Sequence, residues 1–305
     1  MALGGSYNDL YVRQYTDMID HELQQDGSRL RPAVTVEQVQ GERTYFNKIG
    51  KVSSYQRTTR LEDVQLSDQS FERRFVTPIR IESAVALDQM DLDRYLRSPQ
   101  PELAQAIAKE LGRQMDEIIE DAIAGDAARE LNGSLSNAPF DTSNFSIAVN
   151  SNLFAGSTMS GDTGLHEGKI IQARQKMETA YAIGSQEMLY VLAPAKQVAG
   201  MMSRSFSQSG AAFRAGNPYL DQLLNVQYIP YEGFGVDGSS DQIAYVMPKS
   251  AIKLGIWQDI KFRADERLDK AGAPTQLMAN MALGAVRMFE EKVVRILCDP
   301  NVAFA

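Results

Sequence analysis

The sequence predicts an α+β fold organised around one long helix. Residues 102–124 carry apolar residues at spacings of three and four, which is the period of an amphipathic helix. Residue types alternate between 48 and 86, as is typical of β-strands, and two β-compatible stretches near the C-terminus are separated by the turn-forming segment DKAGAP. At 1.5 Å per residue the helix is about 35 Å long, which is enough to act as a spine on which a sheet can lie.

The composition excludes several classes of protein. The 305 residues are enough for one large domain or two ordinary ones, and 44% hydrophobic residues can bury a real core. The net charge of -8 argues against a protein that coats nucleic acid, since that binding comes mainly from clustered Lys and Arg. The single cysteine, Cys298, excludes an internal disulfide framework. Because neither a membrane-spanning run nor a secretion leader is present, we expect a soluble protein made in the cytoplasm.

Residues 1–46 contain scattered tyrosines among polar residues and are too polar to close a core of their own. They are expected to form either an arm that is ordered by another surface or a disordered tail. The alternating residues that follow predict two strands, near 51–57 and 71–81, joined by a charged and turn-rich middle. Because an isolated two-stranded ribbon is only marginally stable in water, we expect a protruding hairpin that leans on another surface.

The predicted helix at 102–124 has two faces. Its apolar stripe consists of Leu103, Ile107, Leu111, Met115, Ile118 and Ala122. The charged residues are assigned to the opposite, solvated face: Lys109, Glu110, Arg113, Asp116, Glu117, Glu120 and Asp121. Pro99 and Pro101 precede the helix and Gly125 follows it, in agreement with the usual preferences of helix ends.

The chain after this helix predicts a mixed α/β layer. Residues 132–162 are rich in Gly, Ser, Asn and Thr, and only 145–149 has strand character. The expected elements that follow are a helix at 168–183, the strand MLYVLA at 188–193, a helix begun by Pro194, a mobile loop at 203–216, and strands at 226–231 and 243–247.

The C-terminal part is expected to form one long antiparallel hairpin. Its two strands are predicted at 255–268 and 277–297, and its turn at 269–274. The long helix is the natural surface for this hairpin to pack against.

No catalytic, cofactor-binding or metal-binding motif is present. His21 and His166 each lie outside any motif that would supply a partner. Residues 161–169, GDTGLHEGK, lack the first glycine and the Ser or Thr that a Walker A loop requires. The acidic run at 88–93 lacks the glycine and the distal glutamate of a calcium loop. The sequence therefore predicts a protein that is not an enzyme.

The order of these elements resembles the major capsid protein of tailed bacteriophages, which has the HK97-like fold. Two stretches carry the resemblance: VTPIRIESAVALDQMDLDRYL leading into PELAQAIAKELGRQMDEIIEDAI, and the closing DERLDKAGAPTQLMANMALGAVRMFEEKVVRI. It covers nearly the whole chain. The resemblance implies a structural protein that self-assembles into hexamers and pentamers of an icosahedral shell, enclosing double-stranded DNA without specific binding.

The resemblance also implies a division of the chain. The parts are an N-arm at 1–46, an extended E-loop at 47–86, a P-domain at 87–167 with its spine helix at 102–124, an A-domain at 168–253, and a return to the P-domain at 254–305 with its P-loop near 269–274. The implied partners are further copies of the chain, a separate scaffolding protein, because no cleavable scaffolding segment is present, and a portal protein. No membrane is implied, and the location is the virion after synthesis in the host cytoplasm.

Charged residues of the E-loop and the P-loop are the candidates for contacts between subunits: Arg57, Arg60, Glu62, Asp63, Arg73, Arg74, Asp269 and Lys270. Mixed charge of this kind gives orientation and register between copies more than affinity. An arm and a ribbon that cannot bury their own surfaces also favour an assembly in which copies cover one another. The alternatives are an encapsulin-like compartment shell, which shares the fold, and a soluble α/β enzyme, for which no assembled catalytic group is found.

Overall fold

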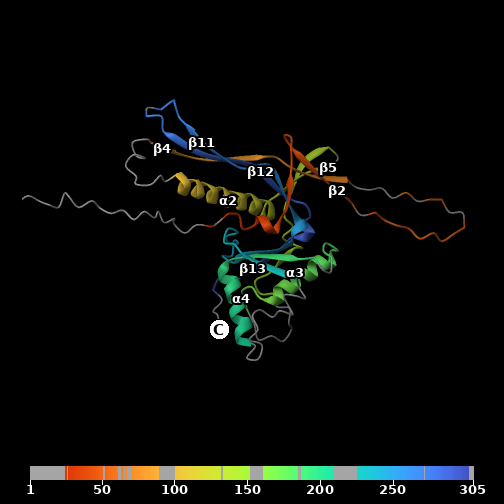
Figure 1. The fold of residues 1–305 in the computed structure, drawn as a ribbon. Helices are drawn as coiled ribbons and strands as arrows, with labels where there is room; N and C mark the ends of the chain where they lie inside the picture. Colours follow the sequence, from red (N-terminus) through yellow and green to blue (C-terminus); the bar gives the residue numbers. More distant parts are fainter. Residues whose placement is uncertain are drawn as a thin grey trace, which may run out of the picture.

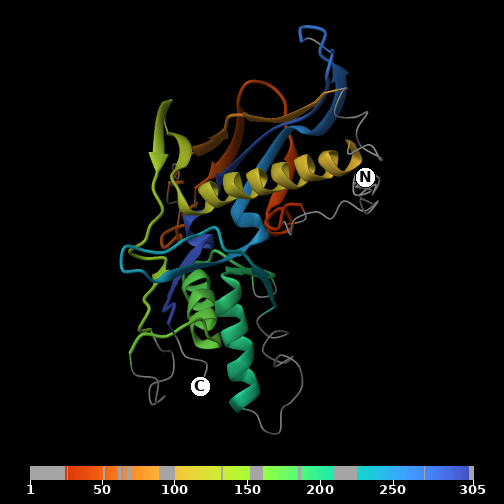
Figure 2. The ribbon, with the colours of Figure 1, turned by 90° about the vertical axis from the view of Figure 1, so that its left-hand side faces the viewer.

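The computed structural model describes residues 25, 27–50, 52–60, 63, 64, 66, 71–88, 100–131, 133–151, 161–184, 187–208, 225–270 and 272–301, with side chains of the last helix described as far as Met201. Three sheets and three α-helices lie within these parts. Figures 1 and 2 show the longest helix under one sheet, and the two shorter helices under another sheet on the opposite side of the molecule.

The long helix α2 (Gln100–Ala124) packs against a four-stranded sheet of order β1-β11-β12-β4. The strands are β1 (Thr35–Gln38), β4 (Ile79–Leu87), β11 (Ile252–Glu266) and β12 (Thr275–Arg287). β11 and β12 are antiparallel, β4 pairs antiparallel with β12, and β1 pairs parallel with β11. The helix predicted at 102–124 is therefore present and lies along this sheet (Figure 1). Its Ile107, Leu111 and Met115 are buried in the core that it shares with the sheet.

The chain from Leu30 to Gln38 belongs to this core, whereas the sequence placed it in an arm. A short 3-10 helix, η2 (Arg31–Ala33), leads into β1, and Leu30, Ala33 and Val34 are fully buried. This segment covers a flank of α2, and its backbone N–H groups bond to Asp116, which explains why Asp116 is buried although the sequence assigned it to the solvated face. The rest of the predicted arm, residues 1–24, lies outside the described residues.

A second sheet, of order β2-β3-β5-β6, is built around the predicted hairpin. Its strands are β2 (Thr44–Ile49), β3 (Phe71–Val76), β5 (Ala127–Leu131) and β6 (Ser134–Ala138). The outgoing strand predicted at 51–57 is wrong, because the strand lies at β2 and residues 52–60 form no strand. The returning strand is divided near Pro78, which lacks an N–H for a ladder, so that β3 and β4 join different sheets.

The third sheet, of order β7-β13-β10-β8-β9, forms the α/β part. Its strands are β7 (Ser146–Ile147), β8 (Leu189–Ala193), β9 (Val226–Pro230), β10 (Gln242–Pro248) and β13 (Val294–Cys298). The helices α3 (Glu167–Thr179) and α4 (Ala195–Gln208) pack on one face, while Tyr190 and Leu192 of β8 face the core of α2 (Figure 2). The strand β8 is thus buried on both faces, as its continuous apolar sequence requires.

Two predictions in the second half of the chain are corrected. α4 continues to Gln208, so the loop predicted from 203 is helical at its start; residues 209–224 lie outside the described residues. The strand predicted at 277–297 is interrupted by the 3-10 helix η4 (Glu290–Lys292), and β13 leaves the long hairpin for the third sheet. Another 3-10 helix, η3 (Lys249–Ala251), links β10 to β11. In the described part of the chain, no helix is both long and apolar enough to cross a membrane.

Candidate assembly surfaces

The loop between β2 and β3 is the most exposed part of the described chain. β2 and β3 pair from Thr44↔Val76 to Ile49↔Phe71, and the chain then runs away from the body before it returns (Figure 1). Every described residue between 52 and 66 is exposed. They include four large hydrophobic side chains with exposed fractions of 41 to 93%: Val52, Tyr55, Val64 and Leu66. Apolar side chains in this position have no core of their own chain to enter.

One face of the β2-β3-β5-β6 sheet carries further exposed apolar side chains. Tyr45 lies opposite Phe75, and Ile49 opposite Phe71, so these side chains share a face. Tyr45, Ile49 and Phe71 are 41, 64 and 61% exposed. Leu135 of β6 adds a further apolar side chain that is 57% exposed. Asn47, Arg73 and Glu130 lie between these residues on the same face, so the surface is mixed. Exposed apolar side chains within a polar surface favour an interaction site.

The charged residues proposed for the loop are exposed where the structure describes them. Arg57, Arg60 and Asp63 are exposed, and Arg73 lies exposed on β3, opposite Glu130 of β5. The Arg57 Nε donates a hydrogen bond to the carbonyl oxygen of Thr59 at 3.0 Å. Glu62 lies outside the described residues.

Arg74 is not available to a neighbouring chain, in contrast to the prediction. It is 1% exposed, and its Nη2 lies 2.9 Å from both the Glu72 Oε1 and the Glu290 Oε1. The period of the strand explains this difference, because Arg73 and Arg74 necessarily point to opposite faces of the sheet. Arg74 therefore ties β3 to η4 inside the subunit.

Arg287 joins several elements at the base of this sheet. It is fully buried, and its Nη1 donates to the carbonyl oxygens of Ile123 at 2.9 Å and Gly125 at 2.7 Å. Its Nη2 donates to the carbonyl oxygen of Ala138 at 3.2 Å, and Glu290 lies nearby. A cation at this position satisfies the last carbonyl groups of α2 and opposes the negative end of the helix dipole. Burial lowers the pKa of the Arg287 guanidinium from its usual high value.

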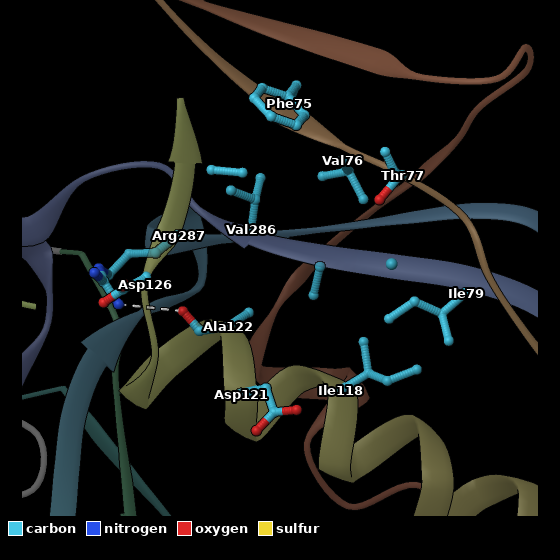
Figure 3. A pocket seen from close by; sticks show the side chains of 13 residues that line it. Phe75, Val76, Thr77, Ile79, Ile118, Asp121, Ala122, Asp126, Val286 and Arg287 are labelled. Carbon is cyan, nitrogen blue, oxygen red and sulfur yellow. Dashed lines mark hydrogen bonds between the residues drawn. The ribbon is translucent and has the colours of Figure 1, made fainter. Parts of the chain in front are cut away.

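A cleft of about 180 Å³ lies between the corner of β3 and β4 and the C-terminal half of α2. Figure 3 shows β12 behind it and the helix below it. Apolar and polar groups line it in similar measure. The apolar side chains include Val76, Ile79, Ile118 and Val286, and the charged ones are Asp121, Asp126 and the buried Arg287. Gly284 forms part of this lining, and a Cβ at that position would lie 2.5 Å from the Val76 Cγ1.

The turn between β11 and β12 holds the other two predicted contact residues. Asp269 accepts hydrogen bonds from Arg267 at 2.6 and 3.0 Å, which lower the pKa of the Asp269 carboxyl. Asp269 and Lys270 are exposed, as is the apolar side chain of Leu268, which is 84% exposed. The turn thus presents both charge and an apolar residue at one end of the long hairpin.

Asp116 has a structural role in the interior that its place on the predicted solvated face did not indicate. It is 1% exposed on α2, and its carboxylate accepts hydrogen bonds from the backbone N–H groups of Arg29 and Leu30, each at 3.0 Å. The side chains of Gln25 and Ser28 donate to the same carboxylate. Asp116 therefore holds the segment before β1 against the helix.

The described residues contain no group of three or more His, Cys, Asp or Glu side chains that could hold a metal ion. Cys298 lies buried in β13, where burial raises the pKa of its thiol to about 11. His166 precedes α3 and is 8% exposed.

Comparison with known proteins adds an independent observation. A family model described as phage capsid protein matches residues 8–300. No curated protein matches the chain. Solved structures similar to it include the capsid of cyanophage P-SCSP1u, with a TM-score of 0.69, 11% identity and coverage of 95% of this chain and 94% of that chain. For the cyanophage Pam1 capsid the TM-score is 0.68 and the identity 11%, with 98% of this chain and 99% of that chain covered. For the capsid of Ralstonia phage GP4 the TM-score is 0.65 and the identity 12%, with 99% of each chain covered.

Proposed function

The chain belongs to the phage capsid protein family, and on this premise we propose that its copies form the hexamers and pentamers of an icosahedral shell that encloses double-stranded DNA. The protein is a structural component of a phage capsid and not an enzyme. The further division into an N-arm, an E-loop, a P-domain, an A-domain and a P-loop is part of the proposal, with the N-arm now ending before Leu30.

The observation that carries the proposal is the exposed loop between β2 and β3, which bears four large apolar side chains. Val64 and Leu66 are 77 and 93% exposed, and Ile49 and Phe71 at the base of the loop are 64 and 61% exposed. Removing such side chains from water favours association by roughly 25 cal/mol per Å² of apolar area. Since the loop runs away from its own subunit, a neighbouring copy is the surface that would cover it.

The overall charge supports a container that holds DNA without gripping it. With a net charge of -8, the chain lacks the excess of cations that neutralises phosphate groups. We expect packaged DNA to make no specific contacts with the wall. A separate scaffolding protein and a portal protein are the further partners that we propose.

Deletion of residues 57–70 tests the proposal. The shortened chain is expected to keep its secondary structure in circular dichroism and to lose the closed particles that the full chain forms in negative-stain microscopy. The scaffolding protein should be present in one arm of the experiment. Normal shells from the shortened chain would show that the loop is not a clamp between subunits.

A pair of single substitutions provides a matched control. Leu66→Asp places a charge in the proposed apolar contact, whereas Leu66→Met keeps an apolar side chain of similar volume. Leu66 is 93% exposed in the isolated subunit, so neither substitution should affect folding of the subunit. We expect Leu66→Asp to abolish shells and Leu66→Met to preserve them.

An encapsulin-like compartment shell is the alternative, because it shares the fold. The two proposals predict different contents of the particle. Particles purified from cells should contain double-stranded DNA if the chain forms a phage capsid, and an enzyme cargo if it forms a compartment shell.

A further inference from the structure

The cleft beside the β3–β4 corner has the size and the chemistry of a socket for one side chain. Its volume of about 180 Å³ is below the roughly 300–1,000 Å³ of sites that hold small ligands. Val76, Ile79 and Ile118 give it apolar walls, and Asp121 and Asp126 add carboxylates (Figure 3). Arg287 also lines it, but its guanidinium is held by the carbonyl oxygens of Ile123, Gly125 and Ala138. A long aliphatic stem that ends in a cation matches both features, because Lys and Arg bury their stems and keep their charged heads in polar surroundings.

The projecting loop carries cations that are free to reach another subunit. Arg57 and Arg60 are exposed, and neither forms an ion pair with another described residue. The Arg57 Nε is engaged by the carbonyl oxygen of Thr59. Arg60 lies midway between the end of β2 at Ile49 and the start of β3 at Phe71, so it is among the loop residues farthest along the chain from the sheet.

The loop of a subunit cannot fill the cleft of the same subunit. The cleft adjoins the C-terminal end of β3, at Phe75 to Thr77, whereas the loop leaves from the opposite end, between Ile49 and Phe71. The six residues of β3 separate these two ends by about 20 Å, and the loop then runs farther away (Figure 1). A loop that occupies the cleft must therefore come from a second copy.

We propose that Arg60 of one subunit inserts into the cleft of the next subunit, with its guanidinium at Asp121. This inference rests on the proposed shell, and it assigns the surface that receives the loop. The charges are complementary, and the flexible stem of Arg60 lies along Ile79 and Ile118. Donor and acceptor are different surfaces of one chain, so the contact is heterologous and repeats around a ring when the rotation closes.

A charge exchange tests the pairing in the full chain. Asp121 is chosen because it is exposed on α2, whereas Asp126 lies next to the buried Arg287. Arg60→Asp alone and Asp121→Lys alone should each raise the protein concentration needed for assembly by about tenfold or more, because each creates a like-charge contact. The double variant Arg60→Asp/Asp121→Lys should recover assembly.

A mismatched pair serves as the control. Glu117 is exposed one turn earlier on α2 and does not line the cleft. Arg60→Asp/Glu117→Lys carries the same net charge as the matched double variant, so it should remain defective. Equal recovery by both pairs would mean that net charge governs assembly, and it would overturn the proposed pairing.

Disulfide trapping gives a second readout that does not depend on assembly yield. Thr77 is exposed and lines the cleft, and the native Cys298 is buried and does not compete. Oxidised shells of Arg60→Cys/Thr77→Cys should give a ladder of dimers, trimers and larger species on a non-reducing gel. Each single cysteine variant should remain monomeric, as should Arg60→Cys/Leu135→Cys, in which the second cysteine lies outside the cleft.

The possible results separate this inference from the proposed function. Shells that form normally but give no ladder, together with no recovery in the matched charge exchange, would refute the socket and leave the shell proposal intact. A ladder that stops at dimers would refute the ring-forming contact. Absence of shells from the unmodified chain, with and without scaffold, would refute the proposed function and this inference with it.

Discussion

Replacement of Asp116 by Ala should detach the segment that precedes β1 from the long helix. The change removes the acceptor for the backbone N–H groups of Arg29 and Leu30, and Leu30 is fully buried. An unsatisfied buried donor costs about 1–3 kcal/mol, so two of them give about 2–4 kcal/mol when Arg29 is partly solvated. Gln25 and Ser28 add little, because their donors can bond to water.

Hydrogen exchange measures this loss directly. Since 1.4 kcal/mol corresponds to a factor of ten, amides of residues 28–38 in Asp116→Ala should exchange roughly 30- to 1,000-fold faster than in the unmodified subunit. Asp116→Asn should recover less than half of the loss, because the amide nitrogen cannot accept a hydrogen bond.

The control is Asp121→Ala, an exposed position on the same helix, which should change stability by less than about 0.5 kcal/mol. Exchange in residues 28–38 that stays within about threefold of the unmodified protein after Asp116→Ala would refute the role of Asp116 as the anchor of this segment.

Three further predictions follow from the interior. Gly284→Ala places a methyl group 2.5 Å from the Val76 Cγ1 and 2.6 Å from the Thr77 carbonyl oxygen, so it should lower the urea midpoint by an amount equivalent to about 1–3 kcal/mol of stability. The control Gly238→Ala should have no steric effect, because nothing lies within 4 Å of the added methyl group. Burial raises the pKa of Glu120, so the folded state binds the carboxyl proton more tightly than the unfolded state, and stability falls as pH rises through the raised pKa. The stability of Glu120→Gln relative to the unmodified protein should therefore increase from pH 4 to pH 7. A difference that does not change with pH would contradict this. Cys298, whose buried thiol has a pKa raised to about 11, should not react with a thiol reagent at pH 8 until the chain is unfolded in urea.

The elements with a clear hydrophobic period were predictable from the sequence. The stripe from Ile107 to Ala122 has the helical repeat, and the apolar run at 188–193 has the length of a buried strand, so both elements occur where they were predicted. The β5–β6 hairpin was missed although its signal is present. The sequence Asn132-Gly133 is a typical hairpin signal, and Gly133 has a φ of 80°, a value that favours glycine.

The differences arise where distant parts of the chain decide the environment of a residue. Asp116 lies among charged residues on a helical wheel, and only the segment at Leu30, 86 residues away, makes it buried. Arg74 could have been separated from Arg73 by the alternation of β3, but its partner Glu290 is 216 residues away. The interruption of the C-terminal strand by η4 likewise depends on which sheet β13 joins. No local sequence pattern indicates these long-range contacts.

We infer that the exposed loop between β2 and β3 is covered by a second copy of the chain. A reconstruction of the assembled particle tests it most directly, because it shows the surface on which residues 52–66 lie. We expect Val64 and Leu66 to be buried against a neighbouring subunit, with Arg60 in that subunit's cleft. A loop that folds back on its own subunit, or that stands in solvent in the closed particle, would contradict it.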